Sequence, residues 1–97
     1  MKKYVINGKN IHDWKTFHFE FKNVMQFPNY YGENMDAWID CMCELSEEPT
    51  MIYLENGKEI KKYNREIVDS LLECAAFVNL RRMETGDVPN LIIAGRF

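Results

Sequence analysis

Three short apolar runs predict β-strands. Residues 3–7 and 50–54 are rich in β-branched and aromatic side chains, and both runs lead into Asn-Gly pairs that favour turns. Residues 91–94 form a third apolar run, which follows Pro89. Because polar residues barely interrupt the last two runs, we expect buried strands there, with residues 91–94 covered on both faces or central in a sheet.

The segment after the first strand allows two interpretations. Phe17, Phe19 and Phe21 alternate with polar residues as in a half-buried strand, whereas a longer set of apolar residues follows helical spacing. We predict a helix, because Asp13 can cap its start and Pro28 lies just beyond its end. The helical stripe consists of Trp14, Phe17, Phe21, Val24 and Met25.

Three more helices are predicted further along the chain. Asn34 is a suitable N-cap for a helix that runs to about Leu45, with the inner stripe Met35, Trp38, Met42 and Leu45. Residues 57–63 are basic and favour a short helix. Asn64 then caps a longer helix that ends at Gly86, with an inner face of Ile67, Val68, Leu71, Leu72, Ala75 and Val78.

The predicted element order is β-α-α-β-α-α-β. Strands separated by helical crossovers pair in parallel through right-handed connections, so this order indicates an α/β fold with a small three-stranded parallel sheet and helices packed on it. The chain has 97 residues, of which 46% are apolar and 13% aromatic, and this content suffices for one hydrophobic core. We therefore expect a single domain spanning residues 1–97.

The N-terminal segment and the cysteines narrow the class of protein. Only three apolar residues follow the basic start before polar residues resume, which is typical of neither a signal peptide nor a membrane span. We expect a cytoplasmic protein that does not bind membranes. The chain has three cysteines, an odd number, and Cys41 and Cys43 point apart on a helix. They are expected to pack as small apolar groups, without a metal or cofactor.

Charge is distributed unevenly along the chain. The segment from Asn23 to Gly57 has no Lys, Arg or His but seven carboxylates, whereas the other residues carry a net charge of +4 and the whole chain carries −3. Such one-sided charge attracts a positively charged partner and repels the phosphates of nucleic acids. The sequence therefore predicts a surface that binds a basic protein. The seven carboxylates are Glu33, Asp36, Asp40, Glu44, Glu47, Glu48 and Glu55.

One side of the helix predicted after Asn34 is acidic. At about 100° per residue, Ile39 lies at the border of a side that carries Asp36, Asp40, Cys43, Glu44 and Glu47. Like charges one turn apart cost a helix roughly 0.2–0.5 kcal/mol per pair, and no lysine on this helix relieves them. The acidic side therefore slightly destabilises the isolated helix but favours binding of a basic partner. This interpretation requires that the carboxylates form no ion pairs with guanidinium or ammonium groups of the same molecule.

The loop before this helix contributes further candidates. Tyr30 and Tyr31 are adjacent, so we expect one to pack inward and the other outward. A tyrosine beside carboxylates suits a protein interface, because it offers a large area and a polar tip. Gly32 and Asn34 are expected to serve the geometry of the turn.

An enzyme is the competing interpretation of the same carboxylates. Asp36 and Asp40 could act as an acid/base pair or hold a magnesium ion. However, His12 and His18 lie outside the acidic segment, and the chain has no Gly-rich phosphate loop or nucleophile motif. Carboxylates on an open helix also lack the burial that a general acid needs. We therefore predict no catalytic residues and no enzyme activity.

The string from Phe27 to Met42 resembles the barstar family, intracellular inhibitors of secreted bacterial ribonucleases of the barnase type. Weaker agreement at residues 5–8 and 91–93 extends the resemblance over most of the chain. The resemblance implies a three-stranded parallel fold and a protein that blocks the basic active site of a ribonuclease. The family pattern Pro-x-Tyr-Tyr-Gly-x-Asn-x-Asp-Ala-x-x-Asp-Cys is reproduced by Pro28, Tyr30, Tyr31, Gly32, Asn34, Asp36, Ala37, Asp40 and Cys41.

The resemblance also implies roles for individual residues. Asp40 would enter the nuclease active site where a phosphate would sit, and Asp36 would engage a neighbouring basic group. Tight, fast and salt-sensitive binding is implied by the resemblance alone. The protein is expected to be a monomer before it binds. The complete predicted partner-binding set is Tyr30, Tyr31, Gly32, Asn34, Asp36, Ile39, Asp40, Cys43 and Glu44.

The chain departs from the family pattern at the edge of this set. Ile39 stands where barstar has a tryptophan before its central aspartate, Trp38 sits one residue earlier, and Leu45 replaces a later aromatic residue. Substitutions at an interface rim mainly change which partner is preferred. The alternative function is an acidic adaptor or regulatory module that binds a basic partner other than a nuclease. Further candidates on the later helix are Asp69, Glu73 and Glu84.

Overall fold

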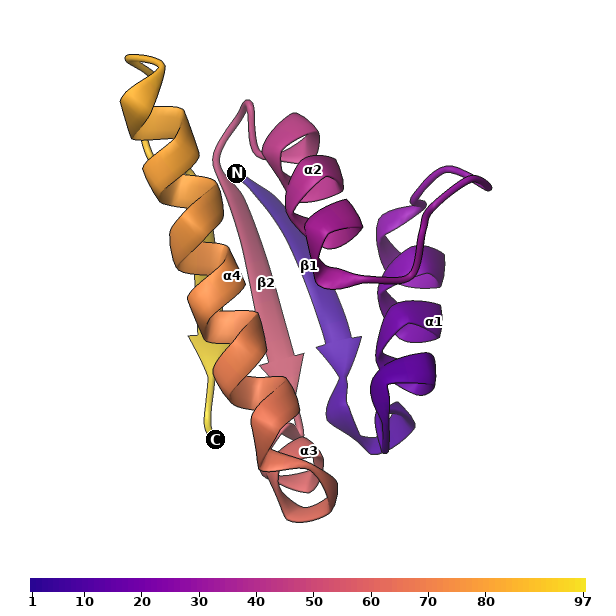
Figure 1. The fold of residues 1–97 in the computed structure, drawn as a ribbon. Helices are drawn as coiled ribbons and strands as arrows, with labels where there is room; N and C mark the ends of the chain where they lie inside the picture. The colour runs from indigo at the N-terminus through magenta and orange to yellow at the C-terminus, as the bar shows by residue number, and fades with distance from the viewer.

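The computed structural model describes residues 1–97 and contains three β-strands and four α-helices (Figure 1). Their order confirms the predicted α/β fold, with one additional 3₁₀ helix after the first strand. In chain order, the elements are β1 (Lys2–Asn7), η1 (Gly8–Asn10), α1 (Trp14–Met25), α2 (Met35–Leu45), β2 (Thr50–Glu55), α3 (Gly57–Tyr63), α4 (Arg65–Glu84) and β3 (Leu91–Gly95).

The predicted N-caps begin three of the helices. Asp13 accepts a hydrogen bond from the Thr16 amide at 2.8 Å, at the start of α1. Asn34 caps α2 in the same way, and Asn64 caps α4. Each cap satisfies an amide of the first turn that has no carbonyl partner within the helix, and this fixes where the helix starts. The helical interpretation of residues 14–25 is therefore confirmed.

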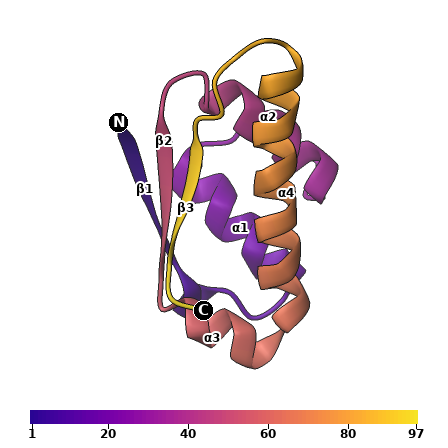
Figure 2. The ribbon, with the colours of Figure 1, turned by 90° about the vertical axis from the view of Figure 1, so that its left-hand side faces the viewer.

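The three strands form one parallel sheet in the order β1-β2-β3. Lys2 pairs with Thr50, and Thr50 pairs with Leu91, so β2 lies between the other two strands. Figure 2 shows α1, α2 and α4 together on one face of the sheet. Two right-handed crossovers that step in the same direction across a sheet place their helices on the same face, so the other face has no helical cover.

The open face corrects two of the burial predictions. In β2, only Thr50, Ile52 and Leu54 are buried, and the alternate residues point to the open face. β3 is an edge strand, where Ile92 is 42% exposed, and not a central or doubly covered one. The expectation for Leu72 is also wrong, because this residue lies beside the buried stripe of α4 and is exposed.

The side of α2 opposite its carboxylates packs in the hydrophobic core. Trp38 is fully buried, and its ring packs edge-on against the ring of Phe21 from α1, with 5.7 Å between centroids. Met42 is also fully buried, and α2 packs along α4 on its other flank. The opposite side of α2 is thereby turned to solvent. None of the helices combines the length and the apolar content that a membrane crossing requires.

Candidate functional site

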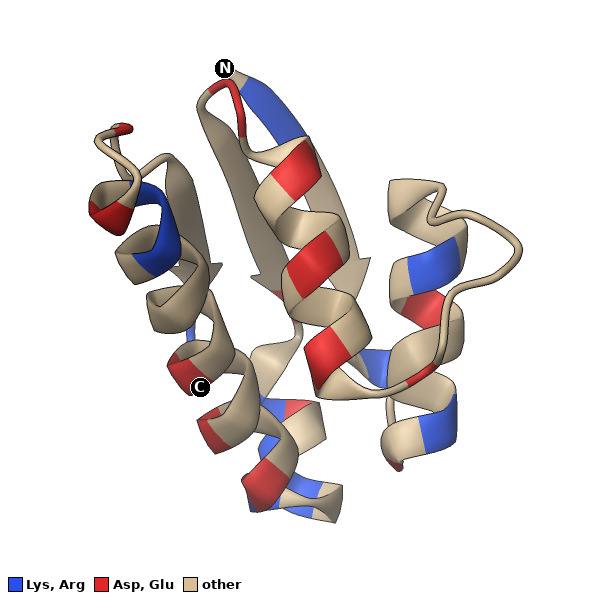
Figure 3. Cartoon of the chain, turned by 45° about the horizontal axis from the view of Figure 1, so that its top comes forward, with Lys and Arg blue, Asp and Glu red and all other residues tan.

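The carboxylates predicted to bind a partner form a continuous exposed row. We define the acidic surface as Asp36, Asp40, Glu44 and Glu47, all of which are exposed. The first three are spaced one turn apart on α2, and Glu47 follows the end of the helix. Figure 3 shows acidic residues along one side of α2, while the basic residues of α3 gather at the other end of the molecule.

The loop that leads into α2 places its two tyrosines differently. Tyr30 is 87% exposed, whereas Tyr31 is only 6% exposed and packs in the core. The expectation that one points inward and one outward is confirmed. Tyr30 is therefore the exposed tyrosine of this loop, and Tyr31 anchors the loop.

The turn between these tyrosines and α2 is shaped by Asn34 rather than by glycine flexibility. The Asn34 side chain accepts a hydrogen bond from the Ala37 amide at 2.8 Å and donates one to the Gly32 carbonyl at 3.3 Å. The residue with left-handed backbone angles is Glu33, with φ of 51°, and not Gly32. Asn34 thus serves the turn as predicted, whereas the left-handed conformation that favours glycine falls one residue after Gly32.

A buried polar contact ties this loop to α1. The Nδ1 atom of His18 lies 2.5 Å from the Tyr31 hydroxyl oxygen, and both residues are buried. The ring of Trp14 stacks on the ring of His18, and the ring of Phe27 packs against the ring of Tyr31. Burial lowers the pKa of His18 below its ordinary 6.5, and the negative charge of Glu33 offsets part of this effect. This contact was not predicted, although His18 lies four residues after Trp14, on the buried side of α1.

This contact predicts how stability depends on pH. The unfolded chain binds a proton at histidine near pH 6.5, whereas buried His18 resists it, so the free energy of unfolding should fall as the pH drops from about 7 to about 5. Urea unfolding across this interval measures the slope. In the His18→Gln variant, a residue that does not titrate can still hydrogen bond to Tyr31, and the slope should flatten. An equal slope in both proteins would contradict the assignment to His18.

One carboxylate of the acidic surface forms an ion pair, contrary to the requirement set by the sequence analysis. Arg81 of α4 donates a hydrogen bond from Nη1 to Asp40 Oδ1 at 2.8 Å. Both side chains remain largely exposed, at 53% for Arg81 and 72% for Asp40. Asp36, Glu44 and Glu47 form no ion pair. The requirement therefore holds at Asp36, Glu44 and Glu47 and fails at Asp40.

The neighbouring arginine has a structural role. Arg82 donates hydrogen bonds to the carbonyl oxygens of Cys43, Glu47 and Val88 at 3.0–3.5 Å. These contacts join the end of α2 to the segment that enters β3. Because α2 has no basic residue in its last turn, Arg82 also supplies the positive charge that a helix C-terminus favours.

The remaining candidates lie at different depths. Ile39 is 8% exposed and belongs to the core, so it supports the acidic surface from beneath. Cys43 is half-buried, with its Sγ 3.8 Å from Arg81 Nη1. Burial raises the pKa of the Cys74 thiol, and the negative charges of Glu73 and Asp36 raise it further. Asp69 and Glu84 are exposed on α4, the helix beside α2.

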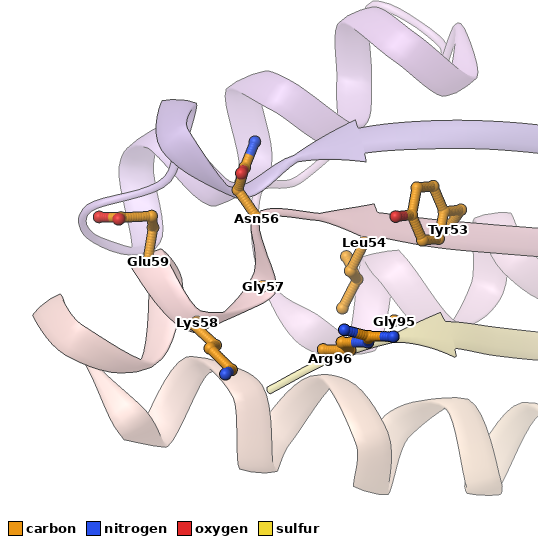
Figure 4. Close-up of a pocket in the computed structure, with 8 residues that line it drawn as sticks. All are labelled: Tyr53, Leu54, Asn56, Gly57, Lys58, Glu59, Gly95 and Arg96. Carbon is orange, nitrogen blue, oxygen red and sulfur yellow. The ribbon is translucent and has the colours of Figure 1, made fainter.

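The main cleft of the molecule lies elsewhere. It measures about 660 Å³ and is formed at the carboxyl ends of β2 and β3, beside α3. Figure 4 shows Lys58 and Arg96 among the side chains that line this cleft, with the Arg96 nitrogens beside Gly95, while Glu59 points away from them. No group of three or more His, Cys, Asp or Glu side chains is arranged to hold a metal ion. A second hollow, of about 140 Å³, borders Glu44 together with Phe27, Pro28 and Cys41. Asp36, Asp40 and Glu47 line neither cavity, so most of the acidic surface is open.

Comparisons with known proteins relate the chain to one family. The chain resembles the Putative ribonuclease inhibitor YrdF of Bacillus subtilis (strain 168), with 30% identity over 73 residues, which cover 75% of this chain and 80% of that protein. Residues 1–91 match the family described as Barstar (barnase inhibitor), a range that contains every element from β1 to α4 and the first residue of β3. The match spans the acidic surface and nearly the whole fold, and the chain belongs to the barstar family.

Proposed function

We propose that the protein inhibits a basic ribonuclease of the barnase type by placing the acidic surface over the nuclease active site. Membership of the barstar family and the name of the Bacillus subtilis relative support ribonuclease inhibition, rather than catalysis, as the function. One structural observation carries the mechanism: α2 presents a row of exposed carboxylates, and the loop that leads into α2 presents the exposed ring of Tyr30.

The chemistry of the row suits a site built to bind RNA. A ribonuclease holds phosphates with arginine, lysine and histidine, and carboxylates can accept the same charge-assisted hydrogen bonds. Asp40 enters the site, and Asp36, about 6 Å along the helix axis, engages a neighbouring basic group. Tyr30 packs at the edge of the contact, where tyrosine is favoured. Tyr31 and Asn34 hold the loop in position.

The ion pair between Asp40 and Arg81 is compatible with this role. Ion pairs between exposed side chains contribute about 0–1 kcal/mol, because water screens the charges and both side chains lose freedom. A nuclease arginine that forms charge-assisted hydrogen bonds with Asp40 can therefore replace Arg81 at a small cost. The field of the other three carboxylates also accelerates the approach of a basic protein.

Inhibition of RNA cleavage tests the proposal directly. Stoichiometric addition of the protein to a barnase-type ribonuclease should abolish cleavage of a fluorogenic RNA, and inhibition should be competitive with the RNA. It should weaken as ionic strength rises, because salt screens the attraction between the two surfaces. Inhibition that is not competitive with RNA would exclude an active-site block. No inhibition, together with tight binding to a basic protein that is not a nuclease, would support the adaptor function instead.

A further inference from the structure

Arg81 occupies the position that a partner's cation needs. Its Nη1 lies 2.8 Å from Asp40 Oδ1 and 3.8 Å from Cys43 Sγ, so the guanidinium rests on the middle of the acidic surface. It is the one basic side chain that forms an ion pair with this surface, since the other ion pair of the molecule joins Lys2 and Glu48. Neighbouring Arg82 is held by backbone carbonyls and is not available for this role.

We propose that Arg81 is an internal competitor for Asp40, which a partner must displace, and that it thereby sets which basic partners the acidic surface accepts. The inference rests on the proposed function for its biological meaning. Arg81 and an incoming guanidinium use the same chemistry on the same carboxylate, so Asp40 Oδ1 cannot serve both at full strength. Arg81 also repels any cation that approaches Asp40.

The competition discriminates between partners by their chemistry. A single lysine presents a strongly hydrated point charge, and it gains little by replacing a guanidinium that already fits the carboxylate. A site with two or more arginines can bind Asp40 through a planar fork and can use the unpaired carboxylates on either side. Arg81 therefore disfavours weakly basic proteins more than it disfavours an arginine-rich site, which is a repulsive contribution to specificity.

Two probes test the inference, a barnase-type ribonuclease and the peptide hexa-arginine. Isothermal titration calorimetry should show that Arg81→Ala binds each probe about three- to tenfold more tightly than the original protein. Arg81→Gln, which keeps the apolar stem of the side chain, should behave similarly. Arg65→Ala is the matched control, because it removes one exposed arginine from the first residue of α4, away from Asp40. Its effect on affinity should remain below about twofold.

A double-mutant cycle with Asp40→Asn completes the test. If Arg81 acts through Asp40, the gain from Arg81→Ala should shrink in the Asp40→Asn background to the size of the Arg65→Ala effect. The inference is overturned if Arg81→Ala weakens binding, changes it no more than Arg65→Ala does, or gives the same gain without the Asp40 charge. The hexa-arginine measurements need no nuclease. If the two substitutions are coupled in binding to hexa-arginine but the protein inhibits no ribonuclease, the proposed function is refuted, whereas the competition between Arg81 and a partner's cation for Asp40 is supported.

Discussion

Replacing Asp40 with alanine is expected to weaken inhibition of a barnase-type ribonuclease by at least about thirtyfold, which corresponds to about 2 kcal/mol of binding free energy. The substitution removes the central carboxylate of the acidic surface and leaves the nuclease cation opposite it without a partner. It also frees Arg81, whose charge then opposes the nuclease. A fluorogenic cleavage assay at low and moderate salt would measure the change in the inhibition constant.

The same variant should fold normally. Asp40 is exposed, and its ion pair with Arg81 is of the kind that contributes about 0–1 kcal/mol, so the free energy of unfolding should change by less than about 1 kcal/mol. Glu55→Ala is the matched control, because it removes an exposed carboxylate at the end of β2 and should leave inhibition intact. If Asp40→Ala retained full inhibition, Asp40 would not be the residue that enters the active site.

Replacing Trp38 with alanine is expected to lower the free energy of unfolding by about 3–5 kcal/mol. Trp38 is fully buried between α2 and α1, and its removal leaves a cavity beside Phe21. Stabilities of small domains are about 5–15 kcal/mol, so the loss is a large share of the total. Urea unfolding followed by far-UV circular dichroism gives the value. Because Trp38 seats α2, the variant should also inhibit poorly at temperatures where it is partly unfolded.

The Trp38→Phe variant tests how much of this stability comes from the aromatic contact with Phe21. The indole N–H of Trp38 is buried and has no hydrogen-bond partner. Phenylalanine removes this unsatisfied donor and keeps most of the aromatic contact with Phe21, so it should cost less than half as much as alanine. Equal losses for the two variants would mean that the contact with Phe21 contributes little.

Features that depend on neighbours in sequence could be predicted. Asp13, Asn34 and Asn64 each bond to an amide two or three residues away, so the sequence alone locates the starts of α1, α2 and α4. The exposure of Asp36, Asp40 and Glu44 follows from helical spacing opposite buried Trp38 and Met42. The opposite orientations of Tyr30 and Tyr31 follow from their adjacency.

Features that depend on distant segments could not be predicted. The ion pair between Arg81 and Asp40 joins α4 to α2, and no spacing pattern relates two residues so far apart in sequence. Apolar content predicted that β3 would be covered, but the strand order makes it an edge and leaves one sheet face open. Leu72 is exposed because of the angle through which α4 is rotated about its axis relative to the sheet. Helical periodicity alone does not fix this angle closely enough to decide whether a residue at the border of the apolar stripe is buried.

The middle position of β2 constrains how the chain folds while it is being synthesised. β1 has no strand to pair with until Thr50–Glu55 has left the ribosome, because β2 is its only neighbour in the sheet. A nascent chain that ends before Thr50 would contain both α1 and α2 but no sheet beneath them, and their apolar stripes would be open to proteases and chaperones. Closing the long loop between paired parallel strands is also slow. The sheet-supported arrangement of α1 and α2, and with it the acidic surface, would therefore form only after β2 has been synthesised.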